Sequence, residues 1–215
     1  WKNMRGILVA DLGMVNLLRR YPSFIMITDF SLNEFNNVAV ELLHEMGAEE
    51  VTLSPELTLK QMEEIIQNAS IPCEAIIHGH LPLMIMKYCP ISTILDSNHL
   101  EKSCSMCKNK KFGLKDRKGM IFPLLMDPNC KVEVLNARKL CMIEYIDALI
   151  QSNITNLRIQ FTIEDEEEIA HTLRAYIEAV ECALGRKRTP SEKGPFIERI
   201  KKEGFTKGHF FRGVE

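Results

Sequence analysis

The sequence has 215 residues and a mass of 24.7 kDa, and its 27 basic and 29 acidic side chains give a formal net charge of −2. This near-neutral balance excludes a strongly basic nucleic-acid-binding arm as the dominant feature, and a hydrophobic content of 46% excludes disorder of the whole chain. No apolar run reaches the roughly 18–20 residues that a membrane-spanning helix needs, so we expect a soluble, cytoplasmic protein without a membrane partner.

Over about the first eighty residues, short apolar runs are followed by polar or Gly/Pro breaks and then by amphipathic stretches, a pattern that predicts alternating strands and helices. The predicted strands are Gly6–Ala10, Phe24–Thr28, Val51–Leu53 and Cys73–His78. Ser31 and Glu34 have the spacing of a capping box, which predicts the start of the second helix, and Gly47 predicts its end. The third helix is expected from about Leu59 to Gln67.

A different pattern lies between residues 84 and 139, where Cys, Lys, Asp and Gly are concentrated. Apolar runs separated by turn residues predict a small inserted β-meander with strands at Phe112–Lys115, Met120–Met126 and Lys131–Leu135. The first pattern then resumes with a helix at Leu140–Gln151, a strand at Leu157–Phe161 and a helix at Asp165–Leu184. The basic residues after Gly185 predict an irregular extension.

Short strands that alternate with helices predict an α/β fold with a parallel sheet covered on its faces. The predicted strands are too few for a closed eight-stranded barrel, so the chain forms either an open sheet or part of a TIM-barrel-like set of β/α units. We expect four regions: β/α units at 1–83, the Cys-containing β insertion at 84–139, the last β/α unit at 140–184 and an extension at 185–215.

The seven cysteines are the unusual feature of the composition, because an odd number in a cytoplasmic type of sequence favours free thiols and metal ligands over disulfides. Four lie in the predicted insertion with the spacing C-x14-C-x2-C-x22-C: Cys89, Cys104, Cys107 and Cys130. Such soft thiolates predict a tetrahedral sulfur site for zinc or an iron–sulfur cluster. Cys73, Cys141 and Cys182 lie in strand or helix patterns and are expected to be core thiols.

Polar side chains follow the predicted strands at the edge where α/β sheets and barrels bind ligands: Asp11, Asp29, Glu56, His78 and His80. The two aspartates fit either a helix cap or a site residue. Glu56 and the histidines favour a site, and only one histidine is expected to face it because alternate strand residues point to opposite faces.

Phosphate-binding and hydrolase motifs are absent, because GxGxxG, GxxxxGK[ST], GxSxG and HExxH do not occur. Arg117 and Arg138 fit anion contacts and surface turns equally well. Basic and aromatic residues come together only at 207–212, which is too short a stretch to predict nucleic-acid binding by itself.

The segment EAIIHGHLPLMIMKYCPIS at residues 74–92 resembles the signature of the peptidase U32 family, the collagenase-like proteases. Further matching segments lie at 53–57, 114–119, 122–123, 127–130 and 208–214, so the resemblance covers nearly the whole chain. It implies a TIM-barrel-like catalytic domain whose first strands precede Trp1.

The resemblance also implies a cofactor. Similar members act in oxygen-independent hydroxylation of tRNA, rRNA or ubiquinone precursors and carry a four-cysteine [4Fe–4S] cluster. Cys89 matches the second cysteine of the signature, and Cys104, Cys107 and Cys130 would complete the ligand set. Pro82 stands where many members have the first signature cysteine, so Zn²⁺ remains an alternative to the cluster.

Three functions are compatible with these residues. A U32-type peptidase would use Glu56, His78 and a bound metal to activate water toward a peptide. A cluster-bearing protein would assist hydroxylation of an RNA or a small aromatic substrate, with Asp11, Asp29, His80 and Arg117 as the substrate-binding residues. A zinc-stabilised module would bind a partner without catalysis. In the barrel interpretation, the two edge strands pair with a missing N-terminal barrel half or with a second copy of the chain.

Overall fold

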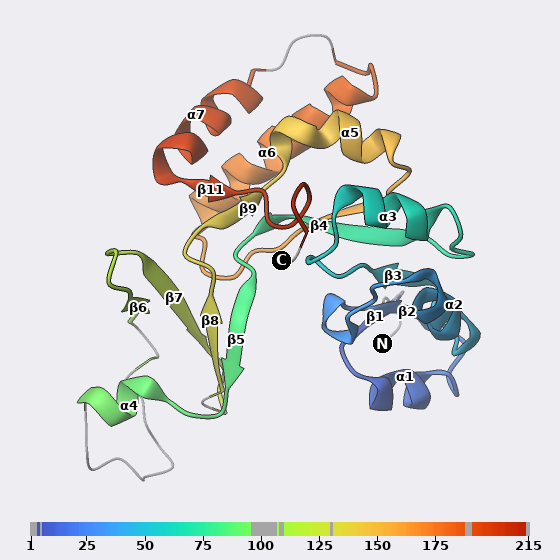
Figure 1. Cartoon of the computed structure of the whole chain (residues 1–215), viewed down its shortest axis with the longest axis horizontal. Coiled ribbons are helices and arrows are strands. Elements are labelled where there is room, and N and C mark those ends of the chain that lie inside the picture. The colour runs from blue at the N-terminus through green and yellow to red at the C-terminus, as the bar shows by residue number, and fades with distance from the viewer. Residues whose placement is uncertain are drawn as a thin grey trace.

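The computed structural model describes residues 4, 6–95, 107, 110–129, 131–187 and 191–213, which form a mixed α/β fold with two sheets (Figure 1). Five strands of the larger sheet run parallel and are neighbours in chain order: β1 (Gly6–Val9), β2 (Ile25–Thr28), β3 (Glu50–Thr52), β4 (Cys73–Gly79) and β10 (Asn156–Ile159). Each strand ends within two residues of the bounds expected from the sequence. The predicted parallel sheet is therefore confirmed.

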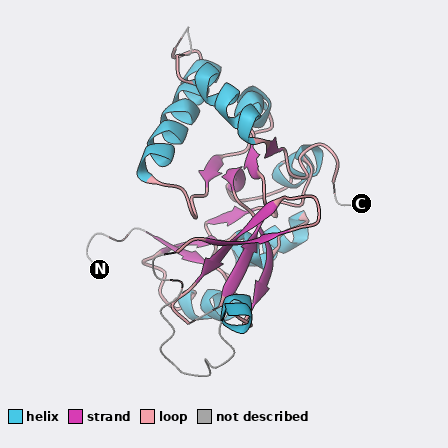
Figure 2. Ribbon diagram, turned by 90° about the vertical axis from the view of Figure 1, so that its left-hand side faces the viewer, coloured by secondary structure: helices cyan, strands magenta, loops and turns pink. Residues whose placement is uncertain are grey.

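Helices pack against the apolar side of the parallel strands: α1 (Leu12–Leu18), α2 (Asn37–Glu45), α3 (Leu59–Ile66), α5 (Ile146–Gln151) and α6 (Glu166–Ala183). Val9, Val51 and Ala75 are at most 1% exposed and join buried helix residues in one core. Leu8, which alternates with Val9, is 51% exposed, as the two-residue period of a strand requires. Figure 2 shows the strands in the middle of the molecule and the helices at its periphery.

The start of α2 differs from the expectation. Asn36 is the N-cap, and its Oδ1 accepts a hydrogen bond from Ala39 N at 2.9 Å. The predicted capping box of Ser31 and Glu34 is wrong, because these residues belong to the short 3₁₀ helix η1 (Phe30–Leu32) and the segment after it. Ser31 Oγ donates instead to the carbonyl of Ala10 at 2.9 Å, which ties the ends of β1 and β2 together.

The smaller sheet is antiparallel and has the strand order β5 (Pro82–Met86), β8 (Val132–Leu135), β7 (Ile121–Met126) and β6 (Phe112–Lys115). Strands β6, β7 and β8 form the predicted β-meander. Strand β5, which was not included in that prediction, pairs with β8 as the fourth strand. In both turns an aspartate organises the backbone: Asp116 Oδ1 accepts from Lys118 N and Met120 N at 2.8 Å, and Asp127 does the same between β7 and β8. The helix α4 (Pro90–Leu95) follows β5.

Two predictions about the second half of the chain are wrong. Leu140 and Cys141, expected at the start of a helix, belong to strand β9 (Lys139–Cys141), which pairs antiparallel with the end of β4. A short 3₁₀ helix, η2 (Ile143–Tyr145), then leads into α5. A buried apolar run of this length does not distinguish strand from helix. The C-terminal extension is also more regular than expected, with helix α7 (Lys193–Glu203) packed on α6 and strand β11 (Phe205–Thr206) parallel to β9.

The parallel strands do not close into a barrel within the described residues. There, β1 pairs with β2 alone and β10 pairs with β4 alone, so each has one unpaired edge. None of the described helices is long and apolar enough to cross a membrane.

Candidate functional site

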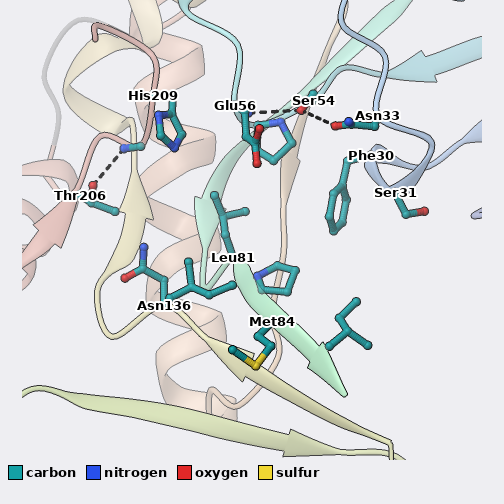
Figure 3. Close-up of a pocket in the computed structure, with 15 residues that line it drawn as sticks. Phe30, Ser31, Asn33, Ser54, Glu56, Leu81, Met84, Asn136, Thr206 and His209 are labelled. Atoms are coloured by element: carbon teal, nitrogen blue, oxygen red, sulfur yellow. Dashed lines mark hydrogen bonds between the residues drawn. The ribbon is translucent and has the colours of Figure 1, made fainter. Parts of the chain in front are cut away.

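A cavity of about 540 Å³ opens at the carboxyl ends of the parallel strands (Figure 3). Phe30 comes from the segment after β2, Ser54 and Glu56 from the segment after β3, and Leu81 from the connection between β4 and β5. Asn136 and His209 complete the opposite side. Both its position and its volume are typical of ligand sites in sheets of this kind.

The segments after β2 and β3 bring polar groups to the cavity. Ser54 is 1% exposed, and its Oγ donates to Asn33 Oδ1 at 3.1 Å and accepts from Glu56 N at 3.4 Å. Asn33 has a φ of 64°, a left-handed conformation that Asn adopts more readily than most residues. Fully buried Leu57 anchors the chain just beyond, which leaves the exposed Glu56 side chain in the cavity lining.

His80 does not line the cavity, but it contacts Asn136, which does. Its Nδ1 lies 2.7 Å from the carbonyl oxygen of Asn136, and Asn136 N donates to the carbonyl of Leu81 at 2.8 Å. Because a carbonyl oxygen only accepts, Nδ1 carries the proton of the imidazole. Burial lowers the pKa of His80, although this hydrogen bond works in the opposite direction.

His78 lies away from the cavity, within the core. It is fully buried between β4 and the helices α6 and α7, where its ring meets Tyr176 edge-on at 5.3 Å and Phe196 at 6.0 Å. Burial lowers its pKa to about 4, with nearby Lys139 acting in the same direction. The structure therefore does not bring His78 and Glu56 together.

The two predicted aspartates have different surroundings. Asp11 is exposed and caps α1, accepting a hydrogen bond from Met14 N at 2.9 Å. Asp29 pairs with Arg158 of β10, whose Nη1 lies 2.5 Å from Asp29 Oδ1. The same guanidinium reaches Glu74 Oε1 at 2.5 Å and donates to Thr52 Oγ1 at 2.9 Å.

Arg158 was not predicted as a functional residue. Its only signal in the sequence is a charged residue between the apolar residues Leu157 and Ile159 of a strand. Its partners come from three other strands or strand ends. Asn33, Ser54 and Asn136 were missed as well, because loop amides and hydroxyls carry no motif. Arg117 lies exposed in the turn between β6 and β7 and does not line the cavity.

Two of the four predicted metal ligands can be placed. Cys89 and Cys107 are partly buried and pack against the same apolar cluster of the smaller sheet, formed by Ile91, Leu124, Val132 and Val134. Cys104 and Cys130 lie outside the described residues. Within the described part of the chain, no three His, Cys, Asp or Glu side chains converge as a metal site.

The Cys89 thiol has a lowered pKa. Partial burial would raise the pKa, but hydrogen bonds from the backbone and hydroxyl of Ser92 and from the backbone of Ile91 outweigh it. Hydrogen bonds of this kind favour the thiolate, which is the metal-binding form of cysteine.

A family model described as Peptidase family U32 matches residues 2–215. The chain belongs to peptidase family U32. The resemblance drawn from the sequence is thus confirmed.

Curated relatives of this U32 chain carry two kinds of name. The tRNA hydroxylation protein P2 of Bacillus subtilis (strain 168) is 25% identical over 162 residues, which cover 72% of this chain and 50% of that protein. The Uncharacterized protease MJ0090 of Methanocaldococcus jannaschii is 24% identical over 186 residues, 83% of this chain and 44% of that protein. The tRNA hydroxylation protein P of Haemophilus influenzae is 21% identical over 256 residues, 96% of this chain and 55% of that protein. The chain thus spans about half the length of these relatives, and no solved structure matched it.

The U32-like signature at residues 74–92 connects the cavity with the apolar cluster that Cys89 and Cys107 contact. It begins in β4 with Glu74, the partner of Arg158, and passes through His80. Leu81 to Ile85 then line the cavity, and the segment ends at Cys89 and the start of α4. One continuous stretch of chain therefore positions both candidate sites.

Proposed function

We propose that this U32 chain takes part in the hydroxylation of an RNA, with the cavity at the strand ends receiving the target base. The observation that carries the proposal is the separation of Glu56 from His78. Glu56 lines the cavity, whereas the His78 side chain, on β4, is fully buried against Tyr176 and Phe196. A water-activating pair of a peptidase needs both groups within reach of one substrate atom. Three of the matched relatives are named tRNA hydroxylation proteins, which supports an RNA substrate.

The cavity has the chemistry of a base-binding site. Phe30 supplies an aromatic ring, while Asn33, Ser54 and Asn136 supply amide and hydroxyl groups. Enzymes that modify a nucleobase extrude it into a pocket, where it stacks on apolar side chains and hydrogen-bonds through its edge. In this proposal Asp29 and His80 position the walls, through Arg158 and the Asn136 carbonyl respectively. Asp11 and Arg117 remain predicted contacts for a larger substrate.

We assign Cys89, Cys104, Cys107 and Cys130 as ligands of an iron–sulfur cluster, with Zn²⁺ as the alternative. The shared apolar cluster supports this assignment, because Cys89 and Cys107 both pack against it. Four thiolates suit either group. When bound, an iron–sulfur cluster supplies one-electron chemistry, whereas zinc would hold the smaller sheet in place.

A TIM-barrel-like arrangement of the parallel strands is the fold that we propose. Strands β2 and β10 are separated by β3 and β4, so in a flat sheet they would lie roughly 14 Å apart. Arg158 extends from β10 and Asp29 follows β2, yet Arg158 Nη1 lies 2.5 Å from Asp29 Oδ1. This close contact supports a strongly curved sheet with both side chains on its concave face. The unpaired edges of β1 and β10 would pair with further strands, from a longer chain or a second copy. The expected division of the chain into four regions, with boundaries after residues 83, 139 and 184, remains a prediction.

The test compares nucleosides of total tRNA from host cells that express the chain, its Cys107→Ser variant or no chain. A nucleoside heavier by one oxygen atom that depends on the chain and is lost in the variant is the expected result. Purified chain is assayed in parallel for cleavage of gelatin. Unchanged nucleosides together with gelatin cleavage that Glu56→Gln abolishes would overturn the proposal in favour of a peptidase.

A further inference from the structure

A second cavity, of about 610 Å³, lies beside the candidate site and is strongly basic. Arg138, Lys207 and Arg212 line it, together with His209 and Phe211, and none of the described residues that line it is acidic. Thr206, Gly208 and His209 line both cavities, so the two adjoin each other. We propose that this second cavity, the basic cavity, binds the phosphate–ribose backbone of a single-stranded RNA segment whose neighbouring base enters the first cavity. The inference rests on the proposed function and specifies how its RNA would be held.

The two arginines are free to bind an anion. Both are exposed, and among the described residues neither forms an ion pair. The backbone N–H of Arg138 donates to Asn136 Oδ1 at 3.1 Å. The Arg138 guanidinium lies over Gly204. Arginine presents planar N–H donors that match phosphate oxygens in pairs, which makes it the preferred residue for such contacts.

An aromatic ring stands beside these cations. Phe211 is 49% exposed, and its ring packs at 4.8 Å against that of Tyr145. Lys207 lies over both rings, with Nζ at 4.6 Å from the Tyr145 centroid and 5.6 Å from that of Phe211, and it donates to the Tyr145 hydroxyl. Proteins that bind single-stranded nucleic acids combine exposed aromatic rings with cationic side chains, because the bases stack on the rings and the phosphates bind the cations. An acidic peptide would use the charges but would gain little from the ring.

The loop that carries these groups is anchored before any ligand binds. Phe210 is 1% exposed in the core, and its carbonyl accepts from Leu59 N at 2.9 Å. His209 Nδ1 lies 2.8 Å from the carbonyl of Gly213, whose own N–H donates back to the His209 carbonyl at 3.0 Å. Burial of Phe210 turns Phe211 and Arg212 outward. A loop ordered in advance binds with a smaller loss of conformational entropy.

Binding of a fluorescent single-stranded RNA of about twenty nucleotides tests the inference without requiring catalysis. The double variant Arg138→Ala/Arg212→Ala should weaken binding and reduce the slope of log affinity against log salt by about 1.4, because each phosphate contact on a single strand contributes about 0.7. Phe211→Ala should weaken binding by a factor of roughly 5 to 150. Arg174→Ala on α6 and Tyr21→Ala are matched controls, since both side chains are exposed and neither lines a cavity described above.

The outcomes separate the inference from the proposed function. RNA binding with an unchanged salt slope in the double variant would overturn the basic cavity as the backbone site, even if tRNA hydroxylation were observed. RNA binding that the variants weaken would support the basic cavity even if no hydroxylation were detected. Inorganic phosphate and poly-glutamate serve as competitors, and displacement of the RNA by poly-glutamate with no effect of Phe211→Ala would contradict the inference and indicate an acidic protein partner. Circular dichroism spectra matching the parent show that the variants are folded.

Discussion

Arg158 and Asp29 are 129 residues apart in the sequence, yet Arg158 Nη1 lies 2.5 Å from Asp29 Oδ1. The second amino group of the guanidinium contacts Glu74 and Thr52, so a single side chain links four strands or strand ends of the parallel sheet. The Arg158 and Asp29 side chains are 18% and 17% exposed, so solvent screens the pair only in part. These contacts connect the segment after β2 with β3, β4 and β10.

Replacement of Arg158 by Met should therefore destabilise the protein by about 3 kcal/mol, because it leaves two partly buried carboxylates unpaired. Urea unfolding followed by circular dichroism measures the change. Arg174→Met provides the control, since Arg174 is exposed on α6 and its loss is expected to change the stability by less than about 0.5 kcal/mol. Equal stabilities for the two variants would show that the cluster does not stabilise the fold.

Gly79, at the end of β4, should not tolerate a side chain. Its φ is 126°, and a Cβ there would collide with the carbonyl oxygen of Gln160, just beyond β10. Gly79→Ala is expected to cost more than about 3 kcal/mol or to prevent folding, because backbone atoms cannot move aside. Gly185→Ala has a comparable positive φ of 70° but nothing within 4 Å, so it should cost only about 1 kcal/mol. A smaller effect at Gly79 than at Gly185 would contradict this account.

The strands and most helices could be predicted because apolar periodicity and helix caps are local properties of the sequence. Strand β9 could not, since Leu140 and Cys141 owe their conformation to pairing with His78 and Gly79, about sixty residues earlier. The rule about strand ends placed Glu56 at the edge of the sheet where the cavity lies, and Glu56 does line that cavity. The role of Arg158 was not predictable, because its partners come from segments far apart in the sequence. The basic stretch at 207–212 was visible in the sequence, but its position beside Arg138 and the first cavity was not.

His78 should make stability depend on pH. Burial lowers its pKa to about 4 in the folded protein, against a reference of 6.5, so below pH 6.5 the unfolded chain binds a proton that the folded chain does not. Stability is therefore lost as the pH falls from 6.5 towards 4, by roughly 3 kcal/mol in total from this group. His78→Leu should lose less stability over the same interval, as measured by urea unfolding at several pH values. An unchanged slope in the variant would show that His78 does not titrate in this way.

Glu34 should make stability depend on pH in the opposite direction to His78. It is 1% exposed, and burial raises its pKa from 4.5 to about 7, partly offset by hydrogen bonds that include one from the Thr28 hydroxyl. Between these values the folded protein holds a proton that the unfolded chain releases, so stability from this group falls as the pH rises from 4.5 to 7. Glu34→Gln stays neutral, and its stability should exceed that of the parent by up to roughly 3 kcal/mol at pH 8, with the gain shrinking towards pH 4.5. Glu45→Gln, at an exposed position of α2, should show no such trend.

The cysteine assignment predicts a specific pattern of metal loss. Anaerobically purified protein should contain about four irons and matching sulfide if the thiolates hold an iron–sulfur cluster, or one zinc and no iron in the alternative. Cys107→Ser should lose most of this metal, because serine replaces a soft thiolate with a poor ligand. Cys182→Ser is the control, since Cys182 lies on α6, outside both the smaller sheet and its apolar cluster. Metal content that is the same in both variants would show that Cys107 is not a ligand.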